Sequence, residues 1–102
     1  MTDINARIAK AKGMQEDNFS INGVQMWFDE TGTFPLPQYT TDWRLAGELL
    51  ESMRFTGVSL YYQTMMEKWG IGWRDEYGSH NNIFADTPQM AICLAWLEWS
   101  EG

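Results

Sequence analysis

The sequence is poor in the residues from which most catalytic and metal sites are built. It has one cysteine and one histidine among 102 residues. A single thiol forms neither an internal disulfide nor a multi-thiolate metal site, which fits a reducing compartment. Cys93 lies among apolar residues of an expected helix, where a thiol is usually an inert small hydrophobe. Any Ser-His-Asp or Cys-His pair would have to use His80.

Metal ligands are present only as one histidine with scattered carboxylates. His80 could bind a metal together with Asp75, Glu76 or Asp86, but these residues show no diagnostic spacing. A glycosidase-like pair of carboxylates stays open for the same reason, because nothing singles out one pair. We therefore expect no enzyme and no cofactor.

Positive charge and long hydrophobic runs are also scarce. Seven Lys and Arg stand against fourteen Asp and Glu, a net charge of −7. Such a chain lacks the basic patch that supplies most of the affinity for nucleic acids. No stretch approaches the roughly 20 apolar residues that cross a bilayer, and Asp3 stands where a signal peptide would be positive. We expect a cytosolic protein that binds neither membranes nor nucleic acids in general.

Aromatic residues, in contrast, make up 15% of the chain, and six of them are tryptophans. This content excludes low-complexity disorder. A chain of 102 residues has the length of one domain and should bury about two-thirds of the surface of its unfolded form. We expect a single domain over residues 1–102.

Apolar residues at helical spacing predict three helices, over about residues 3–12, 42–53 and 88–99. Each is preceded by a threonine that can cap its first turn, namely Thr2, Thr41 and Thr87. The last helix is apolar on more than half of its circumference. It should therefore be buried between a sheet and another layer, which could be a second copy of the chain.

Alternating patterns predict short strands over residues 24–28, 58–66, 68–74 and 83–85. Residues 14–23 and 75–82 are polar and predicted to be loops, and prolines make residues 34–39 an ordered extended connector. Gly70 and Gly72 share one face of their strand, where they leave a shallow groove or, as we favour, let a helix approach closely. Strands joined by such short loops pair most simply antiparallel. The expected class is α+β, a small antiparallel sheet of three to four strands packed with about three helices.

Flat rings, a guanidinium group and amides gather in the segment 61–82. Together they could stack a base and hold its polar edge. The loop 77–82 is harder to explain as core than Trp69 or Trp73, and an anionic ligand would need arginines nearby because the net charge is negative. The candidate ligand-binding residues are Arg44, Tyr62, Arg74, Tyr77, His80, Asn81 and Asn82.

Two blocks of the sequence resemble the phage ABA-sandwich domain family, to which NinX-type phage proteins are similar. The first block is FPLPQYTTDWRLAGELLESM at residues 34–53, and the second is FADTPQMAICLAWLEW at residues 84–99. The resemblance implies an α/β/α sandwich from a phage or prophage, and hence a place in the cytoplasm of the bacterial host. It assigns no site residues, because both blocks consist of caps and core residues.

Three functions are compatible with these observations. The first is a non-enzymatic anti-defence protein that sequesters a small nucleotide-like immune signalling molecule, as a homo-oligomer, by analogy with small phage sponges. The second is an acidic inhibitor of a host defence protein, of anti-CRISPR type, with exposed tryptophans as hot spots. The third is a phage housekeeping or scaffolding protein.

Overall fold

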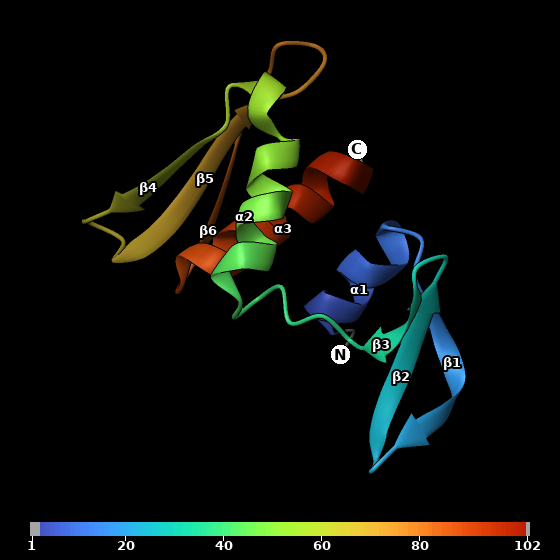
Figure 1. Cartoon of the computed structure of the whole chain (residues 1–102). Helices are drawn as coiled ribbons and strands as arrows, with labels where there is room; N and C mark the ends of the chain where they lie inside the picture. Colours follow the sequence, from blue (N-terminus) through green and yellow to red (C-terminus); the bar gives the residue numbers. More distant parts are fainter. Residues whose placement is uncertain (1–2, 102) are drawn as a thin grey trace.

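The computed structural model describes residues 3–101, except for the side chain of Phe19. Within these residues the chain forms three α-helices and two antiparallel sheets of three strands each. The molecule is elongated, 44 × 29 × 24 Å, with the sheets at opposite ends and the helices between them (Figure 1). The elements are α1 (Ile4–Ala11), β1 (Gln15–Ile21), β2 (Val24–Asp29), β3 (Gly32–Pro35), α2 (Trp43–Ser52), the 3-10 helix η1 (Arg54–Thr56), β4 (Ser59–Gln63), β5 (Lys68–Arg74), β6 (His80–Ala85) and α3 (Pro88–Glu101).

The predicted α+β class, with three helices and antiparallel strands, is confirmed, but the strands form two sheets. The loop prediction for residues 14–23 was wrong, because β1 occupies most of it and pairs with β2. The hairpin turns at Asn22 and Gly23, with φ of 51° and 81°, values that suit this dipeptide in a two-residue turn. β1 lies at the edge of its sheet and is mostly exposed, so it shows no apolar alternation.

The proline-containing segment begins as β3 and continues as the predicted ordered connector to α2. Tyr39 anchors it in the core with 2% of its surface exposed. The buried side chain of Asn5 holds it from α1: the Asn5 amide donates to Gln38 Oε1 at 3.2 Å, and Asn5 Oδ1 accepts from the Thr40 backbone N–H at 3.0 Å. One polar side chain thus satisfies its own hydrogen bonds and fixes the path between the two ends of the molecule.

The predicted N-cap residue is correct for α3 and lies one residue too early for α2. Thr87 accepts a hydrogen bond at its Oγ1 from the backbone N–H of Met90 at 3.2 Å, as predicted. Asp42, and not Thr41, caps α2. Asp3 caps α1, while Thr2 lies outside the described residues. An aspartate adds a negative charge at the positive end of the helix, which a threonine cannot.

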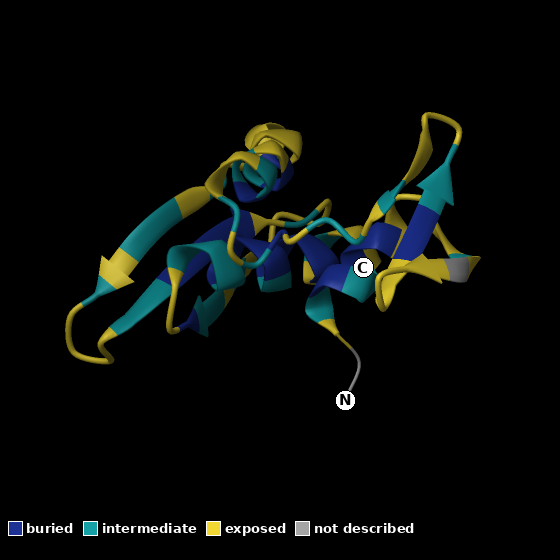
Figure 2. Cartoon of the chain, turned by 60° about the horizontal axis from the view of Figure 1, so that its bottom comes forward, coloured by how far each residue is buried: buried dark blue, intermediate teal, exposed yellow. Residues whose placement is uncertain are grey.

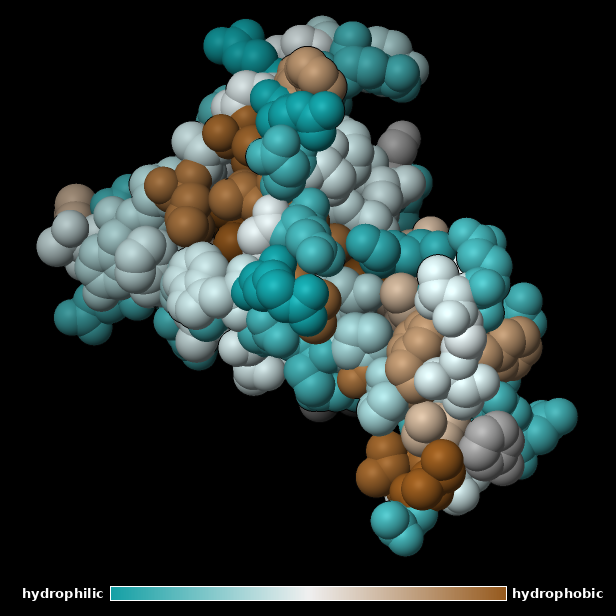
Figure 3. Space-filling view, in the orientation of Figure 1, coloured by the Kyte–Doolittle hydropathy of each residue, from teal (hydrophilic) through white to brown (hydrophobic). Residues whose placement is uncertain are grey.

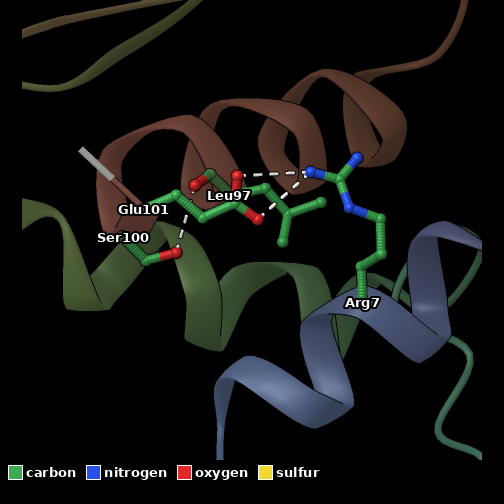
Figure 4. Close-up of polar contacts among 4 residues, drawn as sticks. All are labelled: Arg7, Leu97, Ser100 and Glu101. Atoms are coloured by element: carbon green, nitrogen blue, oxygen red, sulfur yellow. Dashed lines mark hydrogen bonds and ion pairs between the residues drawn. The ribbon is translucent and has the colours of Figure 1, made fainter.

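Helix α3 is the centre of the fold and contacts α1, α2, β5 and β6. Buried residues run through it in the middle of the molecule (Figure 2). Trp96 Nε1 donates to Ser52 Oγ of α2 at 3.0 Å, and Arg7 of α1 forms an ion pair with Glu101 at 3.1 Å (Figure 4). Most of the apolar circumference of α3 is therefore covered by the chain itself, and a second copy stays a prediction. In the part of the chain that the structure describes, no helix is long and apolar enough to span a bilayer.

Candidate functional site

The β4–β5–β6 sheet has one face against α3 and one face directed away from it. Ile71 and Trp73 of β5 are buried in the core cluster shared with α3. Side chains alternate along a strand and cross-strand partners share a face, so the register of the three strands defines the opposite side, which we call the open face. The open face carries Ser59, Tyr61, Gln63, Lys68, Gly70, Gly72, Arg74, His80, Asn82 and Phe84.

The two glycines of β5 form the floor of the open face. A Cβ atom at Gly70 would lie 2.7 Å from the ring of Tyr61 and 2.9 Å from the ring of Phe84, closer than atoms can approach. The favoured interpretation of a closely packed helix was therefore wrong: the glycines make room for side chains of the neighbouring strands. Tyr61 and Phe84 meet edge to face, with ring centroids 6.0 Å apart. The result is an aromatic platform lying over the central strand.

Polar groups continue from this platform along the open face. The Tyr61 hydroxyl donates to Asn82 Oδ1 at 2.8 Å. The same Oδ1 and the imidazole Nε2 of His80 lie 3.0 and 3.3 Å from the position of a Cβ at Gly72. His80 is the register partner of Arg74, so both occupy the end of the face next to the β5–β6 loop. Three of the predicted site residues, Arg74, His80 and Asn82, are thus brought together.

The loop prediction for residues 75–82 was wrong over its last three residues, since β6 begins at His80. Asparagines disfavour strands by propensity, but here both side chains form hydrogen bonds, one over the central strand and one within the loop. Asn82 accepts from Tyr61 on the open face, and the Asn81 amide donates to the Ser79 carbonyl at 3.1 Å. Both residues were predicted to lie on one loop, whereas the pleat of β6 directs their side chains to opposite faces of the sheet.

The other four predicted residues lie elsewhere. Tyr62 is on the α3 side of β4, where its ring packs edge to face on Trp69 with centroids 5.3 Å apart. Asn81 is also on that side, and Tyr77 lies at the tip of the loop with 85% of its surface exposed. Arg44 belongs to α2, where its guanidinium lies 3.9 Å from the carboxylate of Glu48.

The predicted set omitted Tyr61, Lys68 and Phe84, which also lie on the open face. Lys68 lies at the end of β5 opposite Arg74 and forms an ion pair with Asp86. The glycine spacing on β5 was the available signal, because residues paired with a glycine on the same face must fill the space above it. Using that signal requires the strand register, which the sequence alone does not specify.

A pocket of about 320 Å³ lies on the α3 side of the same sheet, between the β5–β6 loop and the end of α3. Its loop is shaped by Asp75, whose Oδ1 accepts from the backbone N–H groups of Tyr77 and Ser79, both at 2.9 Å. The hydrogen bond from Ser79 is the main cause that lowers the pKa of Asp75, so the carboxylate stays ionised. The pocket is lined by Trp73, Asp75, Glu76, Tyr77, Asn81, Glu98 and Trp99.

Cys93 and the metal-ligating side chains are the remaining candidates for nucleophilic or metal chemistry. Cys93 is fully buried in α3, and burial raises the pKa of its thiol to about 12, so the thiol stays protonated near neutral pH. In the described part of the chain, no three His, Cys, Asp or Glu side chains lie close enough to hold a metal ion. His80, on the open face, and Asp75, on the loop, are accordingly not joined in such a cluster.

Among the comparisons with known proteins, only the search of solved structures finds a similar protein. No family model matches the chain, and no curated protein is significantly similar to it. A phage protein from Bacillus cereus ATCC 14579, known from its crystal structure, is similar in fold: the TM-score is 0.67 with 24% sequence identity, over 96% of this chain and 89% of that chain. The chain therefore shares the fold of a phage protein.

Proposed function

We propose that this chain is a phage accessory protein of the ABA-sandwich type that binds a small nucleotide-like ligand on the open face. It acts without chemistry, by sequestering an immune signalling molecule in the cytoplasm of the bacterial host. The observation that carries the proposal is the aromatic platform of Tyr61 and Phe84 over Gly70, with Arg74 and His80 at its end. The fold shared with a phage protein supports the proposal that the chain comes from a phage.

The aromatic platform offers rings on which a nucleobase can stack, and the end of β5 offers the guanidinium of Arg74 to a phosphate. Base–aromatic stacking is worth about 1–3 kcal/mol and tolerates any base. A guanidinium binds phosphate through paired N–H donors. Arg74 is exposed and forms no ion pair with another described residue. One free arginine beside a stacking surface offsets locally the repulsion from a net charge of −7.

Calorimetric titration with cyclic mononucleotides, cyclic oligonucleotides and cyclic ADP-ribose variants tests the proposal. We expect one class to bind. Arg74→Gln should then weaken binding by about tenfold, as for the loss of a charge-assisted hydrogen bond. Tyr61→Leu should weaken it by a similar factor through lost stacking.

The matched control is Arg54→Gln, which removes an exposed arginine of η1 that is not part of the open face. It should leave the affinity unchanged. The proposal fails if no nucleotide produces heat. It also fails if Arg74→Gln and Arg54→Gln bind a nucleotide equally well.

The second candidate, an acidic inhibitor of a host defence protein, is favoured by one other observation. Trp43 of α2 is 54% exposed and Phe55 of η1 is 87% exposed. Hydrophobic side chains also gather between α2 and β4 in Figure 3, where the half-buried Leu50, Val58 and Leu60 belong to these elements and the segment joining them. Exposed aromatic residues beside an apolar area are typical of protein interfaces.

Under this alternative the partner is basic, since the chain carries −7. Affinity for a partner with a basic nucleic-acid groove should fall steeply as salt rises, and Trp43→Ala should weaken it by more than tenfold. Binding that is insensitive to salt would contradict this interpretation. The homo-oligomer remains a prediction without support from α3, and size measurement of the native protein tests it.

A further inference from the structure

We infer that the pocket between the β5–β6 loop and the end of α3 is a binding site for an organic cation with a compact apolar body, such as a quaternary ammonium group. The pocket and the open face lie on opposite sides of the same sheet. The inference therefore stands apart from the proposed nucleotide site. It rests on the charge, the rings and the size of the pocket.

The lining carries negatively charged side chains and no positively charged one. It includes the carboxylates of Asp75, Glu76 and Glu98 and no lysine or arginine. Within the described part of the chain, none of these three carboxylates forms an ion pair. Charge of one sign around a concave site raises the local concentration of the opposite ion and disfavours an anion.

Three aromatic rings share the lining with these carboxylates. Trp73 is 2% exposed and forms a fixed wall, whereas Tyr77 at the loop tip and Trp99 of α3 present more open rings. The face of a tryptophan or tyrosine ring attracts a cation through its quadrupole, most strongly a cation that is weakly hydrated. The rings and the carboxylates therefore both favour a positively charged ligand.

The volume of the pocket and the separation of its carboxylates indicate which kind of cation it would bind. The carboxylates do not converge as ligands of a metal ion. A volume of about 320 Å³ is at the lower end of the range of about 300–1,000 Å³ typical of small-molecule sites. It suits a group the size of choline and is too small for a dinucleotide. The cation could be a free amine or the alkylated side chain of a basic protein.

Titration of the ¹⁵N-labelled protein with choline, and with its uncharged isostere 3,3-dimethyl-1-butanol, tests the inference by NMR. We expect choline to shift the indole N–H of Trp99 and the backbone amides of Tyr77 and Asn81. The isostere should bind about tenfold more weakly, because it lacks the charge. The indole signals of Trp27 and Trp43, which lie outside the pocket, should not move.

Substitutions separate the contribution of the carboxylates to choline binding from that of the aromatic rings. Glu98→Gln should weaken choline binding severalfold, and Tyr77→Ala should do the same while Tyr77→Phe retains binding. Glu48→Gln, which removes an exposed carboxylate from α2, is the matched control and should have no effect. The inference is overturned if choline leaves the Trp99 signal unmoved, if the uncharged isostere binds equally well, or if Glu98→Gln behaves like Glu48→Gln.

A peptide that carries trimethyl-lysine distinguishes the two sources of the cation. Binding of the peptide about tenfold tighter than choline would show that the pocket accepts the cation as part of a protein. Equal or weaker binding of the peptide would assign the site to a free amine. Either result supports a cation site, since both probes carry the same quaternary ammonium group.

Discussion

An Ile71→Ala variant is expected to lose about 2–5 kcal/mol of its free energy of unfolding. Ile71 is fully buried at the centre of β5, in the core cluster that includes the buried residues of α3. Removing three of its side-chain carbons forfeits their transfer free energy and leaves a cavity between the sheet and the helix. Because small domains are stable by only about 5–15 kcal/mol, this is a large share of the total.

Urea denaturation followed by circular dichroism measures the loss as a lower midpoint at an unchanged slope. Ile21→Ala is the matched control, since it removes the same carbons from a side chain that is 50% exposed at the end of β1. It should change the stability by no more than about 0.5 kcal/mol. Equal losses in the two variants would show that Ile71 and the buried residues of α3 do not form one core.

The helices were predictable because each shows its pattern within one local stretch. Apolar spacing, a cap and a terminal glycine are all readable without knowing the rest of the fold. Gly57, with φ of +73°, ends η1 after α2 in this way. The cap position was less certain, because Thr41 and Asp42 are both good caps and only the local backbone geometry decides between them.

Strand β1 was not predictable from alternation, since neither of its faces is well buried. Its signal was the Asn22–Gly23 dipeptide, which favours a hairpin turn whatever the strands contain. The start of β6 was missed because polar residues at the end of a sheet resemble a loop in composition. In both places a tertiary pairing, rather than the local sequence, determines the structure.

The predicted site residues stay a prediction, but the structure shows how they are grouped. The rings and amides of residues 61–82 belong to the β4–β5–β6 sheet and its loops. A difference of one residue, however, separates Tyr61 from Tyr62 and Asn82 from Asn81 onto opposite faces. The predicted set therefore mixed residues of the open face with two that line the acidic pocket, Tyr77 and Asn81.

Alkaline pH is expected to destabilise the fold strongly between about pH 9 and pH 12. Burial raises the pKa of the Cys93 thiol from 9.0 to about 12. Burial, and to a lesser degree the charges of Glu48 and Asp29, raises the pKa of Tyr39 from 10.0 to about 12. The unfolded chain thus releases both protons at lower pH than the folded one.

The sign follows from this order of ionisation. Stability is fully present below the unfolded values and is lost as the pH rises toward the folded values. At 1.36 kcal/mol for each pKa unit, the loss approaches upper limits of about 4 kcal/mol for Cys93 and about 3 kcal/mol for Tyr39. Together these losses of unfolding free energy are comparable to the loss expected for Ile71→Ala. They arise from ionisation alone, without any substitution in the protein.

Unfolding free energies measured by urea titration from pH 7 to pH 12 separate this effect from general alkaline repulsion. The double variant Cys93→Ala and Tyr39→Phe removes both ionisable groups at a modest cost in packing near neutral pH. Its stability should therefore fall much less steeply above pH 9 than that of the unmodified chain, so that the two curves converge or cross. Parallel curves would show that other groups cause the alkaline loss, and that Cys93 and Tyr39 reach solvent before the fold opens.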